Sequence, residues 1–280
     1  MPPFMKLSII TVNLNNRDGL QRTIDSVIAQ TWRDFEWIVI DGGSTDGSKE
    51  LIEQYSTHFA YWVSEPDSGV YNAMNKGIRV AKGEYCQFLN SGDWIYSDNT
   101  LEKIFNQNPN GDIIYGDMAH YRNGMFAFVK KYESRLPISL LLERSIGHQS
   151  SFIRTSLLIK DPYDEQFKIV SDWKFYLRKA LQGYSFQYID LIVCAFDLGG
   201  ISYTQIDLRD TERLHVIQQE VPDCIMYDYQ RLTEFLNKKP DPQILAIEQY
   251  RSKRKVYHKM TTALLLLMNL LEKILGKNQK

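Results

Sequence analysis

The sequence predicts an α/β fold: a Rossmann-like, mostly parallel sheet flanked by helices, followed by a helical C-terminal extension. Short β-branched, apolar runs alternate with helical patterns through the first half of the chain, which is typical of a doubly wound sheet. The runs are apolar at nearly every position, as strands buried on both faces are. Beyond about Leu208 only helical patterns remain.

The expected strands and helices follow in order along the chain. Strands are expected at 7–12, 35–40, 84–89 and 112–115, with a further run at 62–66. Apolar stripes at helical spacing predict two helices between them. One stripe begins at Leu20 and ends at Ile28, and the other begins at Val70 and ends at Ala81.

The second half begins with a turn signal. Asn123-Gly124 separates two apolar runs and predicts a two-residue hairpin. A helix is expected over 172–181, and strands over 186–189 and 192–196. We therefore expect one α/β domain over residues 1–205 and a helical extension over 206–280.

Composition excludes several classes of protein. In 280 residues, 33 Lys and Arg balance 34 Asp and Glu, so no general attraction to nucleic acid is expected. The three cysteines show no CxxC spacing, which argues against a disulfide framework or a zinc site. The N-terminus has no pattern of a secretory signal, and the longest apolar stretch, 263–268, is too short to span a membrane. We expect a cytoplasmic protein.

Four acidic residues stand where expected strands end: Asp41, Asp67, Asp93 and Asp117. The carboxyl ends of parallel strands share one edge, and ligands of open α/β sheets bind there. Each Asp alone could instead form a turn or cap a helix. Because four occupy the same topological place, we expect at least two to act on a ligand.

The loops near these residues narrow the ligand class. The segment 41–48 is neither a Rossmann glycine fingerprint nor a P-loop, which disfavours NAD and ATP. The turn at 90–93 presents one hard oxygen ligand, Asp93. A lone carboxylate completed by water and substrate phosphates is a usual way to hold Mg²⁺ or Mn²⁺.

Four segments resemble the family 2 glycosyltransferases, in particular the bacterial branch that builds surface polysaccharides. The segments are 7–12, 39–48, 64–77 and 88–93, in the family's order and spacing. The resemblance extends over about residues 5–205. It implies a GT-A fold and an inverting, metal-dependent transfer. The donor would be a nucleotide-diphosphate sugar, the metal Mn²⁺ or Mg²⁺, and the acceptor a glycan or a polyprenyl-linked saccharide.

The same resemblance implies roles for individual residues. Asp172 would be the general base and Asp93 the metal ligand. His148 would lie at the rim of the site with two residues of the late Gly-Gly-x-Ser loop, Gly200 and Ser202. The residues expected to bind the donor are Thr11, Asn13, Asp41, Asp67, Lys76 and Ser91.

The chain departs from the family at four places. Leu14 stands where many members have an aromatic residue near the base, and Asn72 replaces an Asp common in this branch. The metal turn carries one carboxylate instead of two, and Ser171 replaces the Glu of the usual Glu-Asp pair. From the residues alone, Asp172 could instead be a helix N-cap, Lys76 part of a solvated face, and His148 a structural loop residue.

Two other functions compete with a sugar transferase. A sugar-phosphate nucleotidyltransferase would need a glycine-rich basic loop after the first strand, and residues 11–16 lack one. The other is a non-catalytic nucleotide-sugar-binding subunit of a membrane-associated glycan assembly complex.

The C-terminal segment 251–275 combines basic residues with an apolar helical pattern. This combination suits the surface of an anionic membrane, and would place the protein peripherally on the cytoplasmic face. Packing onto the chain's own domain and a homodimer seam are the alternatives.

Overall fold

The computed structural model describes residues 5–122, 124–198 and 204–237. The chain divides into two compact units, Met1–Val221 and Pro222–Lys280. Of the second unit, the described residues form one helix, α10 (Asp223–Asn237). Every other element below belongs to the first unit. The domain boundary expected at residue 205 stays a prediction.

The described strands form one nine-stranded sheet in the order β3-β2-β1-β4-β8-β6-β9-β5, with β7 paired to β6. The strands are β1 (Leu7–Asn13), β2 (Phe35–Asp41), β3 (Tyr61–Ser64), β4 (Tyr85–Phe88), β5 (Trp94–Ile95), β6 (Ile113–Arg122), β7 (Met125–Lys130), β8 (Ser151–Arg154) and β9 (Phe186–Asp197).

Most of the sheet is parallel, as the sequence predicts. Strands β3, β2, β1 and β4 run in one direction. Strand β8 is antiparallel to both β4 and β6, and β6 is parallel to β9. Strands β6 and β9 therefore run the same way as β1, and the carboxyl ends of all six parallel strands share one edge.

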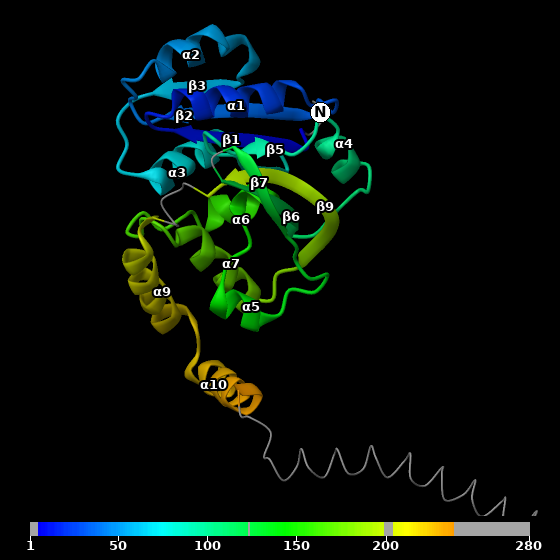
Figure 1. Ribbon diagram of the computed structural model, residues 1–280, viewed down its shortest axis with the longest axis vertical. Coiled ribbons are helices and arrows are strands. Elements are labelled where there is room, and N and C mark those ends of the chain that lie inside the picture. Colours follow the sequence, from blue (N-terminus) through cyan, green and yellow to red (C-terminus); the bar gives the residue numbers. More distant parts are fainter. Residues whose placement is uncertain (1–4, 123, 199–203, 238–280) are drawn as a thin grey trace, which may run out of the picture. The chain divides into compact units, whose positions relative to one another are not determined.

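Helices cover both faces of the sheet (Figure 1). On one face α1, α2 and α4 pack their apolar sides on the strands. On the other, α3, α6 and α7 pack together, with Tyr163 joining α3, β4 and α7 through its ring contacts. The helical elements are α1 (Arg17–Ile28), α2 (Ser48–Gln54), η1 (Ser56–His58), α3 (Val70–Val80), α4 (Thr100–Phe105), α5 (Ile138–Glu143), η2 (His148–Ser150), α6 (Thr155–Lys160), α7 (Ser171–Leu181) and α9 (Ile206–Glu220).

Strand β1 shows why the strand sequences are continuously apolar. Successive side chains point to opposite faces. Ile9 packs into the core beneath α1, and Ile10 faces α3; both are fully buried. On the α3 side, a Cβ added at Gly77 would lie 2.5 Å from Cγ2 of Ile10. A glycine at this position lets α3 approach the sheet closely.

Two expectations about strand ends are wrong. Strand β6 does not end near Tyr115 but continues to Arg122, so Asp117 lies inside it. The expected strands 186–189 and 192–196 are one strand, β9. Its pairing with β6 continues past the expected break, with register shifts on either side of Asp117. Asp117 is buried and accepts hydrogen bonds from Tyr132 N and the Tyr188 hydroxyl, both at 3.0 Å. It is a structural residue of the sheet.

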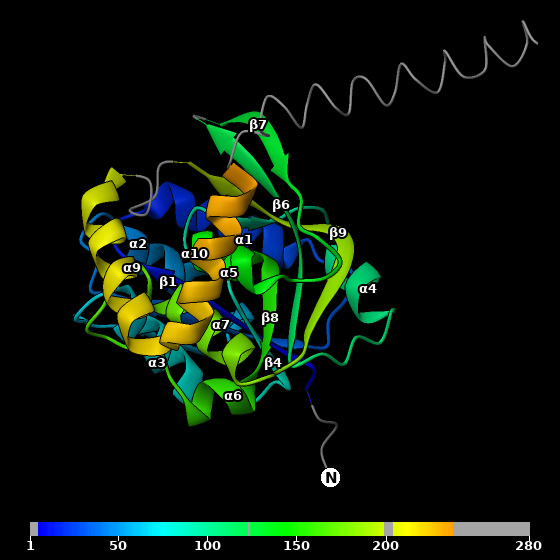
Figure 2. The same ribbon diagram turned by 90° about the horizontal axis from the view of Figure 1, so that it is seen from below.

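The predicted hairpin is confirmed. Strand β7 pairs antiparallel with β6, through Arg122 opposite Met125, and the hairpin extends beyond the rest of the sheet (Figure 2). The predicted helix over 172–181 is confirmed as α7. Strands β8 and β5 were not predicted, because segments of four and two residues carry too little pattern to identify.

Candidate active site at the carboxyl edge of the sheet

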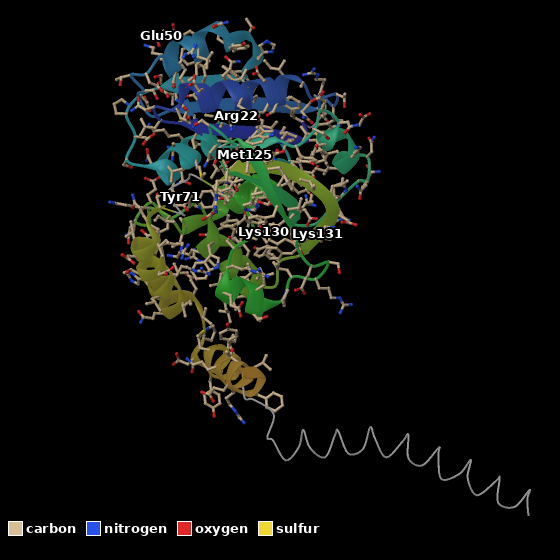
Figure 3. All side chains as sticks on the ribbon, viewed as in Figure 1. Arg22, Glu50, Tyr71, Met125, Lys130 and Lys131 are labelled. Atoms are coloured by element: carbon tan, nitrogen blue, oxygen red, sulfur yellow. The ribbon has the colours of Figure 1, made fainter. Side chains whose placement is uncertain are left out.

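A cavity of about 680 Å³ lies at the carboxyl edge. Its walls come from the N-terminal turn of α1, from α3, from the loop after β4, from the end of β9, and from α7 and α9. Four residues predicted from the sequence line it together: Ser91, Asp93, His148 and Asp172. Figure 3 labels Arg22 on α1, Tyr71 on α3 and Lys130 on β7, three further residues that line the cavity from separate elements.

Asp93 lies in the turn that follows β4, and Thr23 of α1 fixes that turn. The Thr23 hydroxyl donates to Asp93 O at 2.7 Å and accepts from Gly92 N at 3.0 Å. Asp93 is buried, with 6% of the residue exposed. Burial raises the pKa of this carboxyl to about 7, against the lowering effect of His148 and Gln149. A buried carboxylate of this kind is stabilised by a cation.

The surroundings of Asp93 fit a divalent cation held by few protein ligands. Asp197 lies at the end of β9, lines the same cavity and interacts electrostatically with Asp93. Asn90 Oδ1 is buried and has no hydrogen-bond partner among the described residues. In the described part of the chain, no three His, Cys, Asp or Glu side chains form a metal-binding group. Hard oxygen ligands of this number suit Mg²⁺ or Mn²⁺, with substrate phosphates and water completing the coordination.

Asp172 is held at both oxygens. The Tyr71 hydroxyl donates to Oδ1 at 2.8 Å, and His148 Nδ1 lies 2.9 Å from Oδ2. An ionised carboxylate only accepts hydrogen bonds, so His148 carries its proton on Nδ1. Its Nε2 then accepts from Asn90 Nδ2 at 3.3 Å. The resulting chain Asn90–His148–Asp172 crosses from the loop after β4 to α7.

The alternative that Asp172 merely caps α7 is not supported. The N-cap position is Val170, and no side-chain hydrogen bond caps the helix. Tyr71 is buried, and its hydroxyl also lies 2.7 Å from Ile169 O. Burial and the Asp172 charge hold the pKa of Tyr71 well above its usual value, so this hydroxyl stays a proton donor.

Asp41 is fully buried, and its carboxylate accepts five hydrogen bonds from its own loop and neighbouring strands. Oδ1 accepts from Asn13 Nδ2 and the Ser44 hydroxyl, and Oδ2 accepts from Gly43 N, Ser44 N and the Ser64 hydroxyl. Burial acts to raise the pKa of Asp41, but these hydrogen bonds hold it below the usual value. Asp41 and Asn13 thus shape the loop after β2. That either touches a donor stays a prediction.

Asp67 and Leu14 lie beside this loop. A Cβ at Gly42 would stand 2.6 Å from Asp67 Oδ2 and 3.2 Å from Leu14 Cδ1, so the glycine admits the carboxylate to the loop backbone. Leu14 is 58% exposed. Asp67, Leu14 and the Gly42 backbone form a second patch on the carboxyl edge, at the ends of β1, β2 and β3, outside the lining of the cavity.

The other predicted donor residues divide into three groups. Ser91 lines the cavity and its carbonyl accepts from Asn16 Nδ2 at 2.8 Å. Thr11 is fully buried and accepts from Trp37 Nε1 at 3.0 Å, so its side chain belongs to the core. Lys76 pairs with Glu65 at 2.7 Å instead of lining the cavity. Gly200 and Ser202 lie outside the described residues.

Sequence reasoning missed several residues of the site: Asn16, Arg22, Tyr71, Asn90 and Asp197. Tyr71 and Asn90 stand inside segments already singled out, at 64–77 and 88–93. Because both stand inside segments that carry the family's motifs, their position in the sequence could have marked them as site residues. Nothing local marks Asp197, which long β6–β9 pairing brings to the cavity.

The sequence model of Glycosyl transferase family 2 matches residues 8–184. The chain belongs to this family. A glycosyltransferase of Mycobacterium tuberculosis (strain CDC 1551 / Oshkosh) is 37% identical over 207 residues, covering 70% of this chain and 76% of that protein. The PGL/p-HBAD biosynthesis glycosyltransferase of Mycobacterium bovis (strain BCG / Pasteur 1173P2) is 30% identical over 216 residues, covering 74% and 83%.

Solved structures share the fold. S. aureus TarS 1–349, in complex with UDP, superposes with a TM-score of 0.60 at 21% identity, covering 84% of this chain and 71% of that one. The mannosyltransferase PcManGT from Pyrobaculum calidifontis, in complex with GDP-Man and Mn²⁺, gives 0.57 at 17% identity, covering 75% and 61%.

The predicted family, fold class and enzyme class are therefore confirmed: the protein is a family 2 glycosyltransferase with a GT-A fold. Membership favours a sugar transferase over the nucleotidyltransferase and over the non-catalytic subunit. Within the described ranges, no helix is both long and apolar enough to cross a membrane.

Proposed function

We propose that the protein is an inverting, metal-dependent glycosyltransferase. It transfers a sugar from a nucleotide-diphosphate sugar to a glycan or lipid-linked saccharide in cell-surface polysaccharide biosynthesis. The observation that carries the proposal is a buried carboxylate, Asp93, sharing one cavity with a second carboxylate, Asp172, that two neighbours orient. The two carboxylates can take different tasks: Asp93 would hold the cation that stabilises the leaving group, and Asp172 would remove the proton from the acceptor.

The donor extends along the carboxyl edge in this proposal. Its nucleoside lies over Leu14, Gly42 and Asp67, and its diphosphate lies toward Ser91 and Asp93. Solved relatives with the same fold bind UDP, UDP-GlcNAc or GDP-Man, which supports a nucleotide-sugar donor. Leu14 offers an apolar surface but no aromatic ring to the base.

Asp172 is the general base. The acceptor hydroxyl attacks the anomeric carbon from the face opposite the nucleotide and gives its proton to an oxygen of Asp172. His148 and Tyr71 hold the carboxylate in place through the bonds at 2.9 and 2.8 Å. General base catalysis of this kind contributes roughly 10²–10⁴-fold to the rate. One displacement inverts the anomeric carbon, and no protein nucleophile is needed.

Asp93 would hold the divalent cation, with Asp197 and Asn90 Oδ1 as the nearest further oxygen donors. The cation, when bound, neutralises charge on the departing nucleoside diphosphate. Arg22, which stacks on Trp94 with its Cζ 5.0 Å from the ring centre, adds a fixed positive charge on the same side.

The test is a screen of UDP- and GDP-sugars with Mn²⁺ or Mg²⁺, measuring release of nucleoside diphosphate with water as acceptor. Release with at least one donor, lost on chelation and restored by the metal, is expected. Asp93→Ala should remove this metal-dependent release while the protein stays folded. Asp98→Ala is the matched control, because that exposed loop carboxylate does not line the cavity. Full metal-dependent release by Asp93→Ala would contradict the assignment.

The segment 251–275 lies outside the described residues, and we propose that it attaches the enzyme to an anionic membrane surface. Basic residues followed by an apolar helical pattern support this. The attachment would keep a cytoplasmic enzyme close to a lipid-linked acceptor. A homodimer through the same segment is the rival arrangement, and it predicts an oligomer whose mass falls when the segment is removed.

A further inference from the structure

Three cations line one part of the cavity and take no part in the mechanism above: Lys130, Arg144 and Arg213. They come from the end of β7, the residue after α5 and the middle of α9. We call them the cationic cluster. They are electrostatically coupled, since Arg144 and Arg213 both act on Lys130.

Two members of the cluster, Lys130 and Arg213, are held in place by neutral groups. Lys130 Nζ donates to Ser145 O at 3.1 Å and lies 5.0 Å from the centre of the Tyr132 ring. Arg213 Cζ lies 4.6 Å from the centre of the Trp173 ring, and its Nη2 is buried with no hydrogen-bond partner among described residues. In the part of the chain that the structure describes, none of the three forms an ion pair with Asp or Glu.

The nearby carboxylates on α9 bind other groups directly, and Asp210 acts on Arg213 only through its charge. Glu212 accepts from the backbone N–H groups of Lys168 and Ile169 at 2.8 and 2.9 Å. Asp210 pairs with Arg209 at 2.9 Å. Burial, and after it the charges of Arg144 and Arg213, together lower the pKa of Lys130 to about 8. Partly buried like charges without counter-ions cost stability, and a ligand anion would relieve that cost.

We infer that the cationic cluster binds a phosphoryl group carried by the acceptor. The inference rests on the proposed function and names the acceptor's chemistry. A guanidinium presents a planar fork of donors that matches phosphate oxygens, and a lysine adds a point charge. The buried, unpartnered Nη2 of Arg213 is such a donor.

The position of the cluster assigns the phosphoryl group to the acceptor instead of the donor. Arg213 stacks on Trp173, the residue next to Asp172. The proposed donor residues Ser91 and Asp93 belong to the loop after β4, where α1 contributes Asn16 and Arg22. An acceptor with its hydroxyl at Asp172 thus places a neighbouring phosphoryl group at the cluster.

The experiment uses the full chain saturated with Mn²⁺ and the nucleoside diphosphate identified by the donor screen, so that the donor site is filled. Three probes are then titrated by calorimetry. Geranyl-diphosphate-linked N-acetylglucosamine represents a lipid diphosphate, and a short glycerol phosphate oligomer represents a phosphodiester polymer. Octyl N-acetylglucosaminide is the uncharged comparison. Inorganic phosphate tests for binding of the bare anion.

The variants are Lys130→Met and Arg213→Gln. The matched control is Lys131→Met, because this neighbouring exposed lysine does not line the cavity; Figure 3 labels both lysines. We expect at least one phosphate-bearing saccharide to bind more tightly than octyl N-acetylglucosaminide. Each cluster variant should weaken that probe about 10- to 100-fold, the usual range for a charged hydrogen bond, with nucleotide affinity unchanged. Lys131→Met should bind like the wild type.

The outcomes separate the alternatives. Tightest binding of the geranyl compound identifies a lipid diphosphate, and tightest binding of the oligomer identifies a phosphodiester polymer. The inference is overturned if the uncharged saccharide binds as well as both, if only inorganic phosphate binds, or if Lys131→Met has the same effect. It is also overturned if cluster variants lose nucleotide affinity, since the cluster would then hold the donor. Failure of the wild type to bind any nucleotide would instead contradict the proposed function.

Discussion

Replacing Asp172 with Asn tests the proposed base with little disturbance of the fold. The new Oδ1 can still accept from the Tyr71 hydroxyl, now 2.8 Å from Asp172 Oδ1. The new amide nitrogen faces His148 Nδ1, so the imidazole moves its proton to Nε2. The Asn90 amide then rotates and offers Nε2 its Oδ1, which has no partner among the described residues of the wild type. The imidazole keeps both of its hydrogen bonds, and Asn90 Nδ2 takes the position of the unpartnered Oδ1.

The expected magnitudes follow from this geometry. Two hydrogen bonds to a charged acceptor become neutral ones, and the difference is about 1 kcal/mol for each. The free energy of unfolding should therefore fall by about 1–2 kcal/mol. Turnover should fall much further, by roughly 10²–10⁴-fold, because the proton acceptor is gone. That rate loss corresponds to about 3–5 kcal/mol of transition-state stabilisation.

The assay measures kcat at saturating donor and metal, together with the nucleotide dissociation constant and the melting temperature. Asp164→Asn is the matched control. This change also weakens a hydrogen bond to a carboxylate, the one that Lys174 of α7 donates to Asp164 at 2.7 Å, but Asp164 lies outside the cavity. We expect both variants to lose similar stability and only Asp172→Asn to lose turnover. Unchanged kcat with weakened nucleotide binding would refute the assignment of Asp172 as base.

Three further predictions address the loop, the cluster and the tail. Asp41→Asn should lower the free energy of unfolding by about 2–4 kcal/mol at pH 7, because an amide cannot accept all five hydrogen bonds. The pKa of Asp41 is lowered from 3.8 in the folded protein, so this stabilisation is present above pH 3.8 and is lost as the pH falls through the pKa of the folded state. The denaturation curves of the wild type and Asp41→Asn should therefore converge in acid. The pKa of Lys130 is lowered from 10.5 to about 8, so between these values the unfolded chain binds more protons and stability rises with pH. Lys130→Met should remove about 1–3 kcal/mol of that rise, a range reduced because Lys130 is partly exposed to solvent. The substitution should not destabilise the free protein at pH 7. Thermal melts of the wild type and the variant from pH 7 to 10 check both expectations. Removing residues from Val256 onward should release the protein from anionic vesicles in sedimentation at low salt, whereas equal, salt-insensitive binding by both forms would favour the rival packing or dimer arrangement.

The sequence determines the fold class because the apolar residues of its strands already show that both faces of each strand are buried. Strand β1 is apolar on alternate and adjacent positions alike, which only a strand covered on both faces allows, and both Ile9 and Ile10 are fully buried. The edge location of Asp41, Asp67 and Asp93 follows too, because parallel strands put their carboxyl ends together. Asp172 was identified through a family motif, not through local chemistry.

The tertiary structure decides what each of these carboxylates can do. Four similar aspartates have four environments. Asp41 accepts five hydrogen bonds from its loop and from two neighbouring strands, and Asp67 is partly exposed beside Gly42. Asp93 is buried in the cavity wall, and Asp117 is fixed inside β6. Local sequence cannot separate them, because the groups that surround each one come from other strands and helices.

The same reason explains the residues that the sequence did not reveal. Tyr71 and His148 meet at Asp172 only because α3 and η2 bring them to the start of α7. The cationic cluster is assembled from β7, the end of α5 and α9. Hydrophobic patterning depends on residues close together in sequence, so strands and helices can be predicted from the sequence alone. The charge balance of a cavity depends on side chains far apart in sequence, so it exists only once the elements have packed.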